Sequence, residues 1–119
     1  MKVNRQQLYH QGRDFFDLDG NAVMKLDRKA AVEVCLEVAS RGLLILRIEG
    51  GIWSDRTFEA RLDAIWDGAD PPIKEKEADE NNRAAANFIL SCPSDYDAFI
   101  ITAFPFNSYS STVDRALPA

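Results

Sequence analysis

The stretch LLILRIEGGIWSDRTFEARLDAIWDG, residues 43–68, decides which fold the sequence predicts. It begins with LLILRI (43–48), a nearly unbroken apolar run that is typical of a strand covered on both faces. Two glycines end the run, because they give the backbone freedom for a sharp exit. Asp55 then serves as the N-cap of a helix whose apolar residues recur at helical spacing, which predicts a helix over residues 55–67.

The segments on either side complete the predicted fold. A helix is expected over residues 27–41 and another over 73–91, while AFIITA (98–103) is expected to be a second buried strand. Residues 22–26 are a candidate edge strand. A strand, two helices and a strand make a crossover that favours parallel neighbours. The predicted fold class is therefore α/β, a small sandwich of two or three mainly parallel strands with helices on both faces.

Length and composition are those of an ordinary globular domain. The chain has 119 residues, 46% of them hydrophobic and 28% charged, which predicts one domain over residues 1–119 with a real core. The Ser- and Pro-rich tail, residues 105–119, is expected to be loosely held. A membrane span would need ~20 consecutive apolar residues, and no run approaches that length. The polar start of the chain lacks the apolar region of a secretory signal.

The cysteine content indicates the cellular compartment, and the charge excludes some classes of partner. Cys35 and Cys92 are the only cysteines, and both are expected to be reduced, which indicates a cytoplasmic protein. The isoelectric point near 4.8 argues against nucleic acid and against anionic membranes as partners, because both require a basic face. The sequence does not determine the oligomeric state.

The acidic residues are concentrated in one block, residues 49–80, which also contains Trp53 and Trp66. The block holds ten acidic and four basic residues, a net charge of −6, whereas the whole chain carries −5. Such a field attracts a positively charged partner and repels nucleic acid. Tryptophan is also enriched among interface hot spots. The alternative is a solvated acidic surface around two tryptophans of the core.

Helical geometry sharpens this prediction. At 100° per residue, Asp55, Glu59, Asp63 and Asp67 form one stripe along the predicted helix. Phe58, Leu62 and Ile65 form its buried face, and Trp66 lies on the seam between the two. The candidate partner-binding residues are Glu49, Trp53, Asp55, Glu59, Asp63, Trp66, Asp67 and Asp70.

Residues suited to catalysis or metal binding are scarce. His10 is the only histidine, and no cysteines or histidines have metal-ligand spacing. Residues 17–21 hint at a calcium loop, but its glycine is misplaced and Arg28 stands where glutamate is needed. Cys92 and His10 could form a nucleophile dyad only if folding brought them together. The number of carboxylates is compatible with a glycosidase-like pair, although no cleft is evident. We therefore expect a binding protein without catalytic residues, metal or cofactor.

Two segments, IEGGIW (48–53) and FEARLDAIWDG (58–68), resemble small bacterial immunity proteins. These are encoded beside polymorphic toxins, such as those of contact-dependent growth inhibition. The resemblance extends over about residues 42–103. It implies a protein that binds and blocks one cognate toxin domain in the cytoplasm. A basic nuclease would suit the charge, because carboxylates imitate phosphate and accelerate association. The alternatives are a small enzyme or metabolite-binding domain, and a structural partner subunit.

Overall fold

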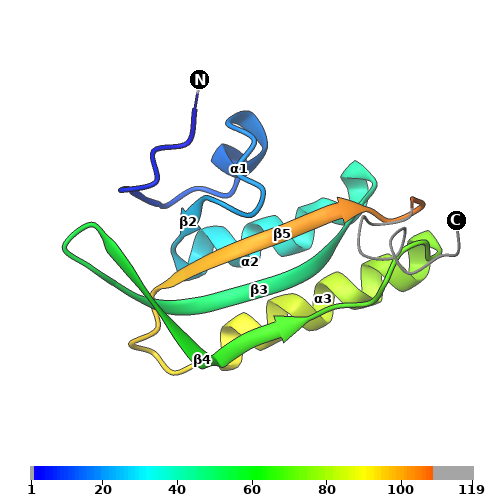
Figure 1. Cartoon of the computed structure of the whole chain (residues 1–119). Helices are drawn as coiled ribbons and strands as arrows, with labels where there is room; N and C mark the ends of the chain where they lie inside the picture. The colour runs from blue at the N-terminus through cyan, green and yellow to red at the C-terminus, as the bar shows by residue number, and fades with distance from the viewer. Residues whose placement is uncertain (1, 109–119) are drawn as a thin grey trace, which may run out of the picture.

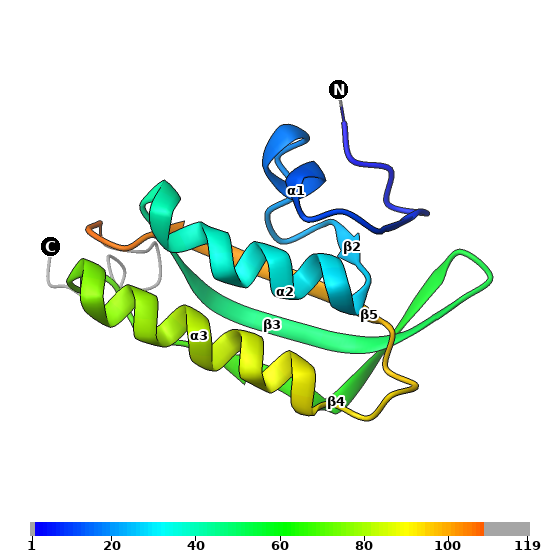
Figure 2. The same cartoon turned by 180° about the vertical axis from the view of Figure 1, so that it is seen from behind.

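The computed structural model describes residues 2–108 as one five-stranded sheet with two long helices on a single face (Figures 1 and 2). The strands lie in the order β1-β2-β5-β3-β4. Their bounds are Leu8–Tyr9 (β1), Lys25–Leu26 (β2), Leu43–Ser54 (β3), Thr57–Asp67 (β4) and Ala98–Pro105 (β5). The helical segments are α1 (Arg13–Asp17), α2 (Arg28–Glu37), the 3-10 helix η1 (Val38–Arg41) and α3 (Glu75–Ser91).

The predicted sandwich of mainly parallel strands with helices on both faces is wrong. Strand β3 is antiparallel to both β4 and β5, and β2 is antiparallel to β5. Among the described strands, the short pair β1 and β2 alone is parallel. Both long helices lie on the same side of the sheet in the two views (Figures 1 and 2). The error has one source: residues 57–67 form a strand, so β3 continues into a hairpin and not into a helical crossover.

Other predicted elements are confirmed. The helix predicted over 27–41 is α2 followed by η1, and Asp27 caps it by accepting a hydrogen bond from Ala30 N at 2.8 Å. Gly42 ends it in the left-handed conformation with φ of 79°. The helix predicted over 73–91 is α3. The two predicted buried strands correspond to β3 and β5, although β3 continues six residues further, to Ser54.

The β3–β4 hairpin has two irregularities that disguise it in the sequence. Its turn residues, Asp55 and Arg56, have φ of 51° and 62°, a primed turn that usually carries Asn or Gly. The pairing then runs from Gly51–Ala60 to Glu49–Ile65, so it moves two residues along β3 but five along β4. The additional residues form a bulge in β4. They also break the strand alternation and imitate helical spacing, which explains the wrong prediction.

The core lies between α2, α3 and the sheet face that they cover. Its largest fully buried side chains include Phe99, Met24, Leu26, Ile45, Ile48, Ile89, Ile101 and Val34. Arg28, the first residue of α2, locks the end of α3 and the following loop to this core, and its guanidinium lies 5.6 Å from the centre of the Phe99 ring. It donates hydrogen bonds to the carbonyl oxygens of Ile89, Cys92, Pro93 and Tyr96, at 2.7 to 3.1 Å.

The segment after β5 begins with ordered contacts. Phe106 N donates to Gly42 O at 3.1 Å, and Phe106 O accepts from Ile73 N at 2.7 Å. The start of the tail that was expected to be loose is therefore tied to both neighbouring loops. Residues 109–119, the rest of that tail, lie outside the described residues. A single domain over residues 1–119 stays a prediction.

Candidate functional site

The sheet face turned away from α2 and α3 gathers several of the predicted binding residues. Ile48 and Ile101 point into the core, so their neighbours along the strands point to the opposite side. We call this side the open face. It comprises Arg47, Glu49 and Trp53 of β3, Phe58, Ile65 and Asp67 of β4, and Ile100 and Thr102 of β5.

The centre of the open face is one carboxylate flanked by two isoleucines. Glu49 is paired in register with Ile65 on one side and Ile100 on the other, and all three are half-buried. In the next row, Arg47 Nε lies 3.7 Å from Asp67 Oδ1. Both of these side chains are exposed, so their ion pair contributes little to stability and stays available to a partner.

At one end of this face, the turn end of the β3–β4 hairpin projects past the helices as an arm (Figures 1 and 2). Trp53 and Phe58 face each other across its two strands, and both are half-buried. The backbone of Trp53 is fixed, because its N–H donates to Asp97 Oδ1 at 2.8 Å. Asp55 lies at the tip. Glu59 is paired with Ile52, which places it on the opposite side of the arm from Trp53.

The structure thus separates the predicted binding residues, and the single acidic stripe is wrong because it required a helix. Glu49, Trp53 and Asp67 share the open face. Asp55 and Glu59 belong to the arm, where Glu59 Oε1 is 2.6 Å from Arg61 Nη1. The other three lie elsewhere: Asp63 in the β4 bulge, Trp66 packed against the core opposite Ile48, and Asp70 in the exposed loop after β4.

Sequence reasoning missed the residues that hold the bulge. The hydroxyl of Tyr96 donates to both carboxylate oxygens of Asp63, at 2.9 and 3.1 Å. This hydrogen bond raises the pKa of Tyr96. Leu62, predicted to be buried, is 89% exposed. The Tyr96–Asp63 contact joins residues 33 positions apart, so it cannot be predicted from a local sequence pattern.

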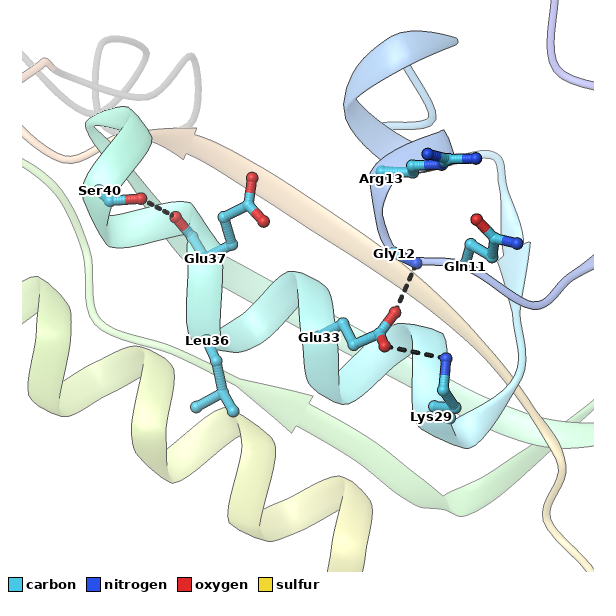
Figure 3. A pocket seen from close by; sticks show the side chains of 8 residues that line it. All are labelled: Gln11, Gly12, Arg13, Lys29, Glu33, Leu36, Glu37 and Ser40. Carbon is cyan, nitrogen blue, oxygen red and sulfur yellow. Dashed lines mark hydrogen bonds and ion pairs between the residues drawn. The ribbon is translucent and has the colours of Figure 1, made fainter.

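Figure 3 shows a surface groove large enough to hold a small molecule. It has a volume of about 680 Å³ and lies between α2 and the segment Gln11–Arg13. Two of its charged groups, Glu33 and Lys29, are already paired: Glu33 accepts from Gly12 N at 2.8 Å and contacts Lys29 Nζ at 2.9 Å. The hydroxyl of Ser40 donates to Glu37 O. The groove is thus the seam where the N-terminal segment docks on α2.

Protonating Glu33 is expected to weaken the docking of this segment around Gly12. The hydrogen bond from Gly12 and the ion pair with Lys29 lower the pKa of Glu33 below its ordinary 4.5. A depressed folded pKa stabilises docking above the ordinary value, and that stabilisation is lost as the pH falls through the lowered pKa. The amide resonance of Gly12 should follow this titration in an NMR experiment, and Glu33→Gln should abolish it. A Gly12 midpoint at or above 4.5 would contradict the prediction.

The groups considered for nucleophilic chemistry have other contacts. His10 Nδ1 lies 2.7 Å from Asp27 Oδ2, and Cys92 Sγ contacts Phe88 O at 3.4 Å. Burial raises the pKa of Cys35 to about 12 and also raises that of Cys92, so both are weak nucleophiles. Within residues 2–108, no group of three or more His, Cys, Asp or Glu side chains could hold a metal ion. None of the described helices is long and apolar enough to cross a membrane.

A sheet face that neither long helix covers, with isoleucines, an aromatic pair and carboxylates on it, is suited to binding another protein. Comparison with known proteins then gives the family of the chain: residues 24–104 match the family described as Colicin-E5 Imm protein, and the chain belongs to it. The chain is 48% identical over 103 residues to the immunity protein CdiI of Burkholderia pseudomallei, covering 87% of this chain and 94% of that protein.

A second relative is the colicin-E5 immunity protein of Escherichia coli, 44% identical over 80 residues, which are 66% of this chain and 96% of the relative. The resemblance drawn from residues 48–53 and 58–68 is thereby confirmed. The protein is an immunity protein and not an enzyme. Residues 1–23, which carry β1 and α1, lie outside the part that matches the family.

Proposed function

We propose that this immunity protein binds one cognate toxin domain in the cytoplasm and neutralises it through the open face and the hairpin arm. The observation that carries the proposal is the position of Trp53. It stands on the sheet side that neither long helix covers, opposite Phe58, with Glu49 further along the same strand. Aromatic anchors beside charged groups are characteristic of tight protein interfaces.

The charge of this surface favours a basic partner, and a nuclease domain is the toxin that best fits. Glu49, Asp55, Glu59 and Asp67 all belong to the open face or to the arm. Their carboxylates would occupy the space that nucleic-acid phosphates take on a nuclease, and would steer the encounter. The similarity to the immunity proteins of two bacterial species supports the toxin partner.

Reversing two charges on the arm is expected to slow association with the toxin. In Asp55→Lys/Glu59→Lys, the association rate constant should fall about tenfold at low salt, because exposed charges act mainly on encounter. The dependence of this rate on salt should also weaken. Surface-binding kinetics with the toxin domain encoded beside this protein, at several salt concentrations, would measure both effects.

The matched control is Asp17→Lys/Glu80→Lys, which makes the same change of net charge on α1 and α3, away from the arm. It should leave association within about twofold of the wild type. If both double variants slow association equally, net charge and not the arm governs encounter. If neither has an effect, the arm is only a solvated surface and the toxin docks elsewhere.

A further inference from the structure

Leu62 is the most exposed large apolar side chain in the described part of the chain. It is 89% exposed, compared with 62% for Leu36 on α2 and 59% for Leu90 on α3. Single apolar residues on a surface are common and by themselves indicate nothing. What distinguishes Leu62 is the backbone that presents it and the charge that surrounds it.

The backbone at Leu62 belongs to the bulge of β4, the outermost strand at this edge of the sheet. Bulges at sheet edges redirect a side chain and interrupt the ladder that a further strand would need. Ala64 anchors the inner end of the bulge, since it is fully buried. A methyl group built on Gly50 would lie only 3.0 Å from the Cβ of Ala64.

The outer end of the bulge is held by the loop between α3 and β5. Tyr96 donates its hydroxyl hydrogen to Asp63, the residue next to Leu62. Tyr96 is in turn fixed through its carbonyl oxygen, which accepts from Arg28 Nη2 at 2.9 Å. A side chain presented from a fixed backbone loses less conformational entropy on binding than one presented from a mobile loop.

The surroundings of Leu62 indicate what it contacts. Asp63 is exposed, and Glu59, three residues before Leu62, is exposed as well. Arg61 is half-buried and already paired with Glu59. An apolar side chain bordered by carboxylates is complementary to an apolar pocket bordered by lysine or arginine. This is the chemistry expected of the basic toxin domain that the open face would bind.

We propose that Leu62 is an apolar anchor of the toxin interface and inserts into such a pocket, while Tyr96 is a positioning residue that acts through Asp63. The inference rests on the proposed function and extends the interface from the open face around the edge of β4. It also means that the toxin contacts this edge through side chains and does not add a strand to it, because the bulge interrupts the ladder.

The test uses the full chain and the toxin domain encoded beside it. Leu62→Ala is expected to raise the dissociation rate constant about 10- to 30-fold, with association and its salt dependence unchanged. Leu36→Ala and Leu90→Ala remove the same atoms from exposed leucines on the two helices, and they should leave dissociation unchanged. Leu62→Met should stay near the wild type. Thermal melts of all four variants should match the wild type, since the side chains are solvent-exposed.

The role of Tyr96 is tested by a double-mutant cycle. Tyr96→Phe should raise dissociation about threefold to tenfold, and in the Leu62→Ala background it should add almost nothing, because it acts through the same contact. In the free protein, Asp63→Asn should return the raised pKa of Tyr96 towards its ordinary value. Fully additive effects of the two substitutions would show that Tyr96 does not position Leu62.

The outcomes separate this inference from the proposed function. If the wild-type protein binds the toxin domain and Leu62→Ala dissociates within twofold of it, the anchor is overturned and the proposed function stands. If the wild-type protein does not bind the toxin domain at all, both are overturned. If Leu62→Ala instead weakens self-association in sedimentation experiments without altering toxin binding, Leu62 contacts a second copy of this chain, and the inference is wrong.

Discussion

Replacing Asn82 with alanine is expected to lower the free energy of unfolding by about 3 kcal/mol, because two backbone groups would be left without partners. Asn82 is 2% exposed and the one polar residue among the buried side chains of the described region. Its Oδ1 accepts from Ile45 N at 2.8 Å, and its Nδ2 donates to Leu43 O at 3.1 Å. An unpaired buried group costs roughly 1–3 kcal/mol, and the lost packing adds to this.

The two bonds are needed because β4 pairs with β3 only from Arg47 onward, so Leu43 and Ile45 have no strand partner on that side. Asn82 and Asn81 supply the missing bonds, and Asn81 Nδ2 donates to Ile45 O at 2.9 Å. On the other side, the pairing between Ile45 and Arg47 moves two residues along β3 but one along β5, which forms a bulge in β3. This bulge determines on which face Arg47 and all later residues of β3 lie.

Urea unfolding followed by circular dichroism would measure the effect, with Asn87→Ala as the matched control. Asn87 is exposed on the same helix, so its replacement should change stability by less than about 0.7 kcal/mol, in the stabilising direction given by helix propensity. Asn82→Asp keeps an acceptor but loses the Nδ2 donor and buries a charge, so it should also destabilise. A loss below about 1 kcal/mol for Asn82→Ala would show that water or a shifted backbone replaces the amide.

The sequence predicts those elements whose pattern is uninterrupted. Residues 27–41 have a capping aspartate, helical spacing and a glycine stop, and all three occur in the structure. Residues 57–67 show the opposite case. Their strand alternation is broken by additional residues, and their turn, Asp55-Arg56, lacks the glycine or asparagine that usually reveals a hairpin. The wrong period placed the carboxylates on a helix, and it made β3 and β5 parallel neighbours in the prediction, whereas they are antiparallel in the structure.

The candidate site was predictable in composition and not in arrangement. Charge and aromatic content pointed to the block 49–80, and the family membership supports a binding role for the chain. Which residues share a face depends on strand register, which a bulge changes for every residue that follows. Contacts such as Tyr96–Asp63 and Asn82–Ile45 join segments 33 and 37 positions apart. Such contacts follow from the folded topology, because no local periodicity encodes them.

Trp53→Ala is expected to weaken the complex with the toxin domain by about 2–4 kcal/mol, a 30- to 1000-fold rise in Kd that comes mainly from faster dissociation. The indole stands on the open face opposite Phe58, where a partner would cover the part that remains exposed. Truncating it should leave the arm in place, because the backbone N–H of Trp53 still donates to Asp97. Competition binding at equilibrium, together with a cell-protection assay, would measure the loss.

Two tryptophan variants make this result specific to the interface. Trp53→Phe keeps an aromatic ring and should recover most of the affinity. Trp66→Ala removes an indole that packs against the core opposite Ile48. It should therefore lower the melting temperature, while the affinity of the folded protein for the toxin changes little. If Trp53→Ala lowers stability as much as Trp66→Ala and leaves Kd unchanged at temperatures where both variants are folded, Trp53 supports the hairpin and does not contact the toxin. The complex would then depend on Glu49, Ile65 and Ile100 at the centre of the open face, and on Leu62 at its edge.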